Sequence, residues 1–177
     1  MFRSASIWWI TRKGGSIGSG HAYKCSKCGE NYEVYTGIGF LFPQEYRKLI
    51  TDMKKGRYGE ERKELFKKIP LLAVDAEKEY YECEECGYWN VSECKDLYKP
   101  KNVDKILKQE YGDKTVEDLG EVPYVMGYDL KHNYELIQKY DHRCPKCKGH
   151  MKKRNIRNVC CPRCGTKNKP LGNVMWD

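Results

Sequence analysis

The sequence predicts an α+β protein made of two small antiparallel β modules, the first of which carries a helical insertion. Two observations lead to this fold class. Four C-x-x-C pairs recur along the 177 residues, and aromatic-rich segments of extended character lead into them. Between the first and second pairs, apolar residues recur instead at helical spacing. Domains this small bury only a thin core, so we expect the cysteines to hold each module together.

The helical insertion is expected at about residues 43–70, inside a first module that spans residues 1–100. In "FPQEYRKLITDMKKG", Pro43 suits the first position of a helix, apolar residues recur at helical spacing, and Gly56 ends the run. The following "GEERKELFKKIP" predicts a second helix that a proline ends. Ahead of the first pair, "SIWWIT" predicts a strand and "RKGG" a turn.

A connector and a second module are expected to follow. Residues 101–121 form the connector, in which a short run of helical spacing ends at Gly112. Residues 122–177 form the second module, where "NYELIQKYDHRCPKC" predicts a strand that leads into the third pair. The two modules therefore share one plan, in which a strand and a C-x-x-C pair occur twice.

The paired cysteines are candidate ligands of two metal sites. A C-x-x-C turn aims both thiolates at one ion, and a glycine after the second cysteine supplies the positive φ that the turn needs. Glycine follows three of the pairs, whereas Lys148 follows the third. Chain order favours the first pair with the second and the third with the fourth, and other pairings stay open. The ligands are Cys25, Cys28, Cys83, Cys86, Cys144, Cys147, Cys161 and Cys164.

The last two pairs have the spacing C-x2-C-x13-C-x2-C, which is typical of a zinc site. "CPKC" and the later "CPRCG" resemble the two halves of a zinc ribbon, the rubredoxin-like fold, over about residues 134–177. The first two pairs resemble it more weakly, because the insertion separates them. The resemblance implies small antiparallel β folds around tetrahedral ions, and hence two zinc ions of structural role. Iron is the alternative metal, since four thiolates also bind iron.

Two other interpretations, a thiol redox enzyme and an iron–thiolate electron carrier, have less support in the sequence than structural zinc sites. The "CPKC" and "CPRC" motifs resemble dithiol redox motifs, but those need a low-pKa cysteine where a helix follows a strand, and no such pattern is present. An iron–thiolate centre would instead carry electrons. His142 and His150 flank the third pair and either could replace a thiolate, although solvent-facing side chains are favoured. Cys94 and Cys160 are left over and are expected to be small buried residues. No residue is assigned a catalytic role.

The net charge of +8 is unevenly distributed along the chain. Residues 142–177 carry a net +9, while residues 71–141 carry −8. Clustered Lys and Arg bind nucleic acid by releasing counterions, and zinc-binding loops present such clusters. The alternative is a protein-interaction adaptor in which both metals are purely structural. The residues expected to contact DNA or RNA are Lys148, Lys152, Lys153, Arg154, Arg157, Arg163, Lys167 and Lys169.

The sequence also predicts the compartment. The apolar stretch within "MFRSASIWWITRKGG" is too short for a signal peptide. No run of about 18 apolar residues predicts a membrane span. We therefore expect a cytoplasmic protein without membrane contact, in which thiols stay reduced and free to bind metal.

Overall fold

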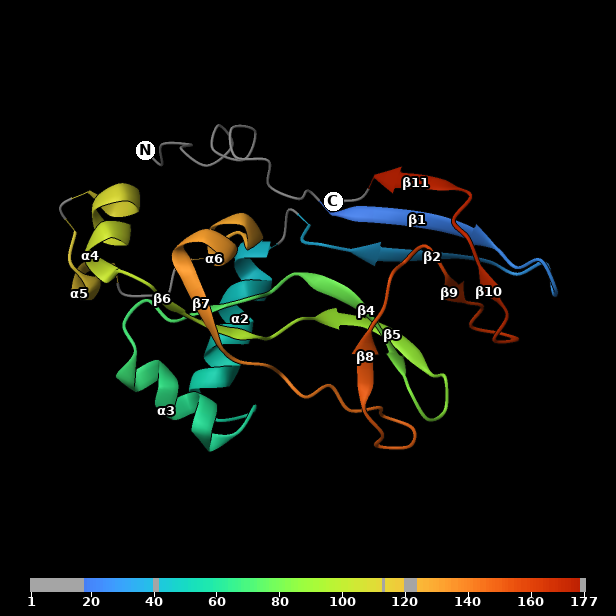
Figure 1. The fold of residues 1–177 in the computed structure, drawn as a ribbon, viewed down its shortest axis with the longest axis horizontal. Helices are drawn as coiled ribbons and strands as arrows, with labels where there is room; N and C mark the ends of the chain where they lie inside the picture. The colour runs from blue at the N-terminus through green and yellow to red at the C-terminus, as the bar shows by residue number, and fades with distance from the viewer. Residues whose placement is uncertain (1–17, 40–41, 113, 120–123, 176–177) are drawn as a thin grey trace. The chain divides into compact units, whose positions relative to one another are not determined.

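The structure is a computed structural model that describes residues 18–39, 42–112, 114–119 and 124–175 (Figure 1). It confirms the α+β class, since helices occur beside several small antiparallel sheets. The chain divides into two compact units. Of the described residues, those within 42–76 and 95–139 form the insert unit, and those within 18–39, 77–94 and 140–175 form the cysteine unit. None of the described helices is long and apolar enough to cross a membrane.

The cysteine unit consists of short strands that lie far apart in the sequence. They are β1 (Ser19–Lys24), β2 (Asn31–Thr36), β4 (Lys78–Cys83), β5 (Trp89–Glu93), β8 (Met151–Lys153), β9 (Val159–Cys160), β10 (Lys167–Asn168) and β11 (Gly172–Met175). One antiparallel sheet has the order β11-β1-β2 and another the order β5-β4-β8, while β9 pairs with β10 (Figure 1). Both sheets therefore combine strands from the amino-terminal half with strands from the carboxyl-terminal end.

Aromatic side chains fill much of the small core of the cysteine unit. Tyr23 and Val34 from the first sheet are buried together with Val159 of β9. The Tyr23 ring stacks on Tyr32, with ring centroids 5.1 Å apart. The Tyr32 hydroxyl donates to the Val159 carbonyl at 3.1 Å. These contacts join β1 and β2 to β9.

The insert unit contains the helices. Its elements are α2 (Phe42–Lys54), α3 (Glu60–Lys68), β3 (Ala73–Val74), β6 (Leu97–Pro100), α4 (Val103–Ile106), a π-helical turn (Leu107–Tyr111), α5 (Val116–Leu119), α6 (Gly127–Asn133) and β7 (Tyr134–Gln138). Three strands form one antiparallel sheet in the order β3-β6-β7. Buried apolar side chains that include Leu71, Ile106 and Leu130 form a core of this unit.

The predicted helices are confirmed. On α2, the apolar side chains whose spacing defines the helix, from Tyr46 to Met53, are buried. Gly56 follows α2 with a φ of 81°, which suits a helix end. The short helix predicted before Gly112 is present as α4 and the π-helical turn, and the Asn102 side chain caps its start. The strand predicted at "SIWWIT" lies outside the described residues.

The two units differ from the consecutive modules at residues 1–100 and 122–177 that the sequence predicts. Residues 101–121, expected as a connector, fall within the insert unit. The difference arises because β1 pairs with β11 and β4 pairs with β8, so that segments far apart in the sequence meet in one unit. Strand pairing over such separations leaves no local signal in the sequence.

Candidate metal centres

All four C-x-x-C pairs form the same turn. In each, the N–H of the first cysteine donates to the carbonyl five residues later at 2.7–2.9 Å. The residue after the second cysteine donates back to the first cysteine's carbonyl at 2.9–3.2 Å. That residue has a φ of 75° at Gly29, 68° at Gly87, 65° at Lys148 and 75° at Gly165. The turn therefore requires the left-handed region, and Lys148 adopts it although it is not a glycine.

The first centre joins the first and the fourth pairs. The Sγ atoms of Cys25 and Cys164 are 3.4 Å apart, and those of Cys28 and Cys161 are 3.6 Å apart. All four sulfur atoms lie within 4.8 Å of one another. Cys25 and Cys161 are buried, while the other two are partly exposed. One metal ion could therefore be held by four thiolates here.

The second centre joins the second and the third pairs. The Sγ atoms of Cys83 and Cys147 are 3.4 Å apart, and those of Cys86 and Cys144 are 3.6 Å apart. Cys83 and Cys144 are buried, whereas Cys86 and Cys147 are exposed. Each centre thus has one buried cysteine from each of its two turns, with the second cysteine of each turn nearer to solvent.

Both centres have the size that a tetrahedral ion requires. A metal–sulfur bond of about 2.3 Å places tetrahedral sulfur atoms about 3.8 Å apart. The closest separations between turns, 3.4–3.6 Å, are near this value. Because four thiolates complete a tetrahedral shell, each centre is a closed set of the kind found in structural sites.

The pairing of the C-x-x-C motifs is nested, and the pairing that chain order favours is wrong. Two strand pairings explain the difference. β1 runs into the first pair and lies beside β11, which follows the fourth pair. β4 ends at Cys83, which lies opposite Met151 of β8, just after the third pair. In addition, the Asn168 side chain accepts a hydrogen bond from the N–H of Ser26 at 3.0 Å, which ties the first turn to β10. The sequence contained no signal for this amide contact.

The turns favour ionisation of two of the thiols. The N–H of Cys28 lies 3.5 Å from the Cys25 sulfur, and such backbone N–H groups lower the pKa of Cys25 to about 6, although burial opposes this. At Cys144, burial raises the pKa, but the N–H groups of its turn, that of Cys147 first, outweigh burial and lower the pKa to about 7. Since the thiolate is the form that binds metal, these N–H groups favour metal binding near neutral pH.

The two unpaired cysteines belong to neither centre. Cys94 and Cys160 are both buried, as the sequence predicts. The Cys160 sulfur lies 3.7 Å from a carboxylate oxygen of Glu82. Burial first, and then the charge of Glu82, raise the pKa of the Cys160 thiol. A thiol that resists ionisation is a poor ligand and a poor nucleophile, which fits a structural role.

The flanking histidines also lie outside the centres. His142 stacks on Tyr81, with ring centroids 3.8 Å apart, and its Nε2 lies 2.9 Å from the Cys94 carbonyl oxygen. His150 is exposed, and its Nδ1 lies 2.9 Å from a carboxylate oxygen of Asp141. The expectation of a solvent-facing side chain is therefore met by His150, while His142 packs inside the cysteine unit.

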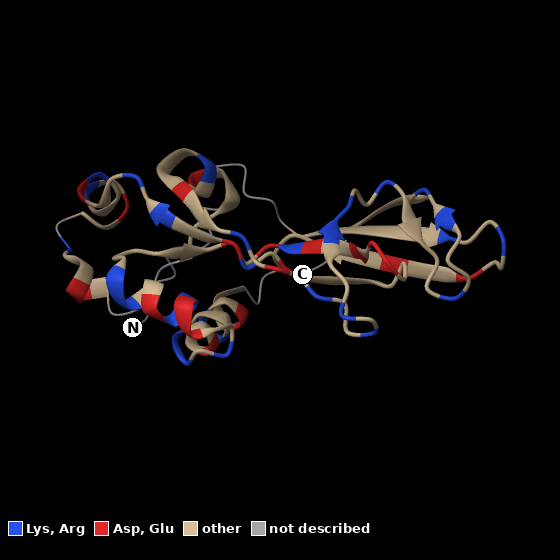
Figure 2. Ribbon diagram, turned by 60° about the horizontal axis from the view of Figure 1, so that its bottom comes forward, with Lys and Arg blue, Asp and Glu red and all other residues tan. Residues whose placement is uncertain are grey.

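The basic residues predicted to contact nucleic acid are all exposed, but most have acidic partners. The ion pairs are Lys152–Glu84 (3.1 Å), Lys153–Glu79 (2.6 Å), Arg154–Glu84 (3.4 Å), Arg163–Glu30 (3.6 Å) and Lys167–Glu82 (3.4 Å). Figure 2 shows acidic and basic positions interleaved along the strands of this unit. Including its undescribed ends, the unit carries 13 Lys and Arg against 10 Asp and Glu. Folding therefore places much of the basic carboxyl-terminal segment beside the acids of β4 and the turn after it.

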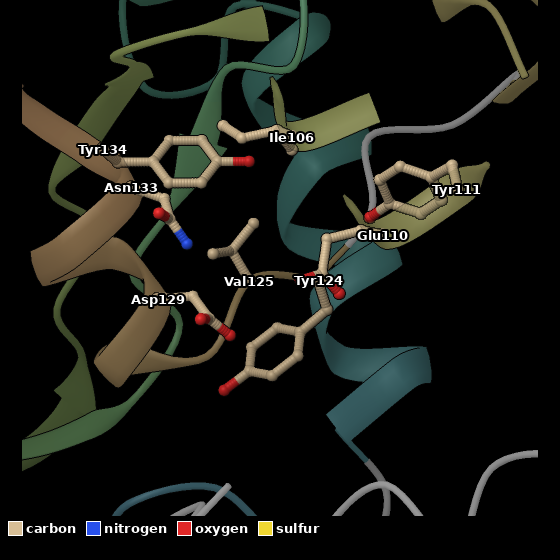
Figure 3. Close-up of a pocket in the computed structure, with 8 residues that line it drawn as sticks. All are labelled: Ile106, Glu110, Tyr111, Tyr124, Val125, Asp129, Asn133 and Tyr134. Atoms are coloured by element: carbon tan, nitrogen blue, oxygen red, sulfur yellow. The ribbon is translucent and has the colours of Figure 1, made fainter. Parts of the chain in front are cut away.

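A small cavity lies in the insert unit (Figure 3). It is lined by Ile106, Glu110, Tyr111, Tyr124, Val125, Asp129, Asn133 and Tyr134. Its volume of about 40 Å³ suffices for a few water molecules and is far below that of a typical ligand pocket. Burial raises the pKa of Tyr111 to about 12, so this phenol is neutral near neutral pH.

Comparison of the chain with protein families, with curated proteins and with solved structures gave no significant match. The resemblance to zinc ribbons therefore stays at the level of the cysteine motifs and their turns. Function has to be inferred from the two metal centres and from the surface around them.

Proposed function

We propose that this is a non-enzymatic, cytoplasmic zinc protein whose two structural zinc ions hold the cysteine unit in a form that contacts nucleic acid. The observation that carries the proposal is the pair of nested centres, each a closed set of four thiolates at tetrahedral spacing. Zinc is the metal that most commonly fills such sites, and it needs no further ligand there. Free thiols in this number also suit a reducing compartment.

The zinc ions are expected to supply much of the folding free energy of the cysteine unit. Its strands are two to six residues long, and its core rests on a few aromatic and aliphatic side chains. Since a metal site rarely exists in an unfolded chain, the free energy of metal binding is also folding free energy. Each centre joins cysteine turns whose ligands lie 58 to 139 residues apart in the sequence, so losing an ion removes a long-range cross-link.

Metal content of paired cysteine variants tests both the sites and their nesting. We expect two zinc ions per chain by mass spectrometry of the native protein, one for each centre. The variant Cys28→Ala/Cys161→Ala damages only the first centre and should retain one ion. The matched variant Cys28→Ala/Cys86→Ala damages both centres and should retain none. Pairing in chain order predicts the opposite result, and bound iron would instead support an electron carrier.

The nucleic-acid part of the proposal is supported by the exposed basic residues of the cysteine unit. Lys148, Arg157 and Lys169 have no acidic partner among the described residues, so they can pair with phosphate without displacing a carboxylate. Binding of labelled DNA and RNA to the metal-loaded protein should weaken steeply as salt rises. Absence of binding even at low salt would contradict this part and leave the zinc proposal standing.

A second candidate function is that of a protein-interaction adaptor with the same zinc ions. It is favoured by the ion pairs of Lys152, Lys153 and Arg154 with acids of β4 and of the turn after it, which already neutralise the densest basic segment. An adaptor would bind no oligonucleotide. The salt series therefore separates the two functions.

A further inference from the structure

The two metal centres use the same turn but differ in charge where the turns reach solvent. Each turn presents the two residues between its cysteines, and all eight of these residues are exposed. They are Ser26, Lys27, Pro162 and Arg163 at the first centre, and Glu84, Glu85, Pro145 and Lys146 at the second. The first centre therefore has two cations and no anion at its turn tips, whereas the second has two anions and one cation.

Folding gathers further basic residues around the first centre. We define the basic rim as Lys24, Lys27, Arg163 and Lys169, all of which are exposed. Lys24 and Lys27 flank the first ligand of the centre, and Arg163 lies within the fourth turn. Lys169 follows Asn168, whose side chain holds the Ser26 backbone at 3.0 Å. Two of the four rim residues, Lys24 at the end of β1 and Lys27 in the first turn, lie outside the basic run that the sequence singles out.

The basic rim has little acidic compensation. Arg163 is paired with Glu30 at 3.6 Å, a long separation for an ion pair. Lys24, Lys27 and Lys169 have no acidic partner among the described residues. In the strand register, Lys24 faces the uncharged Asn31. These lysines are therefore free to pair with an external anion.

At the second centre, the negative charge of Glu84 is already balanced by basic side chains of the same unit. Glu84 contacts both Lys152 and Arg154, at 3.1 and 3.4 Å. Glu85 lies against the third turn, where a Cβ at Gly149 would be only 2.6 Å from the Glu85 carboxyl carbon. A polyanion that approached this centre would meet both carboxylates and would have to displace existing ion pairs.

We infer that the phosphate backbone of nucleic acid binds to the basic rim of the first centre and not to the basic run of Lys152, Lys153 and Arg154. This inference rests on the proposed nucleic-acid function. It adds which surface binds the nucleic acid and by which kind of contact. The lysines of the rim act as point charges, which favours phosphate over bases. Of the nearby aromatic residues, Tyr23 is buried, and Tyr32 is stacked on it and only partly exposed, so neither offers a fully exposed ring for base stacking. Binding is therefore electrostatic and independent of base sequence.

Two variants with equal loss of charge test the inference in the metal-loaded full chain. The rim variant is Lys24→Gln/Lys27→Gln/Lys169→Gln, and the control is Lys152→Gln/Lys153→Gln/Arg154→Gln. Each loses three positive charges at exposed positions, and metal content and melting temperature show that both are folded. The probes are labelled oligo(U), oligo(dT) and duplex DNA of about 20 nucleotides or base pairs, read by fluorescence anisotropy between about 25 and 200 mM salt.

We expect the rim variant to lose affinity for all three probes. On duplex DNA, its log–log salt slope should become less steep by about 2.7, which is about 0.9 for each lost phosphate contact. The control should bind within about twofold of wild type, because the carboxylates of Glu79 and Glu84 lie beside its side chains, offset their positive charge and repel phosphate.

Each contrary outcome contradicts a different part of the inference. If the wild type binds but the control loses as much affinity as the rim variant, the placement on the rim is wrong while the nucleic-acid function stands. If the wild type binds no probe at about 25 mM salt, both the inference and the nucleic-acid function fail. If a poly-glutamate peptide of similar length competes as well as oligo(U), the surface does not select nucleic acid.

Discussion

Replacing Lys148 with glycine should stabilise the cysteine unit, because this position alone among the four turns lacks the glycine that its backbone favours. Its φ of 65° matches the 68–75° of Gly29, Gly87 and Gly165. The left-handed region costs a residue with a Cβ about 1–2 kcal/mol. Glycine returns about 0.5–1 kcal/mol of this through the greater freedom of the unfolded chain. The net gain expected for Lys148→Gly is therefore about 0.5–1 kcal/mol.

The side chain of Lys148 makes little contribution to stability that the substitution would remove. Its Nζ lies 3.5 Å from the Pro145 carbonyl oxygen at an exposed position, which makes a weak hydrogen bond. The reverse substitution, Gly165→Lys, provides the matched control. An added Cβ there would meet no atom within 4 Å, so its cost is conformational and not steric. It should destabilise the unit by about 0.5–1 kcal/mol.

The assay is thermal unfolding of the metal-loaded protein at a fixed excess of zinc, because free metal concentration shifts the melting temperature. For a unit of this size, the expected change is an increase of about 2–8 °C for Lys148→Gly and a similar decrease for Gly165→Lys. Metal content should stay at two ions in both variants. An unchanged or lower melting temperature for Lys148→Gly, together with no effect of Gly165→Lys, would refute the argument that this turn requires the left-handed region.

Three further predictions concern other parts of the chain. Asn168→Ala removes the hydrogen bond to the Ser26 N–H and should speed release of one of the two ions to a chelator about tenfold, leaving the other unchanged. Arg62 is buried and donates to the Lys95 carbonyl at 2.6 Å, so Arg62→Ala should destabilise the insert unit by about 2 kcal/mol in urea without loss of metal. Cys160→Ala should keep both ions, and loss of an ion from this variant would make Cys160 a ligand. In the wild-type protein, alkylation of the Cys160 thiol should become faster as pH rises, because burial raises its pKa.

The sequence by itself determined what is local. The spacing within each C-x-x-C pair and the glycine that follows specify a turn whose hydrogen bonds span five residues, so all eight ligands could be read from it. The same holds for α2, where a proline near the start, apolar residues at helical spacing and Gly56 specify one helix. In both cases the interacting groups lie within a few residues of one another, and their pattern repeats in the sequence.

Only the tertiary structure decided which turns share an ion and where the charges meet. Closing the 132-residue loop between Cys28 and Cys161 costs about 2 kcal/mol more than closing the 13 residues between Cys147 and Cys161. Loop entropy alone therefore favours chain order, and pairing of β1 with β11 and of β4 with β8 outweighs it. Those pairings also place Lys152 beside Glu84 and leave Lys27 without an acidic partner among the described residues. Contacts between strands more than 60 residues apart depend on the whole fold, so no window of the sequence could show them.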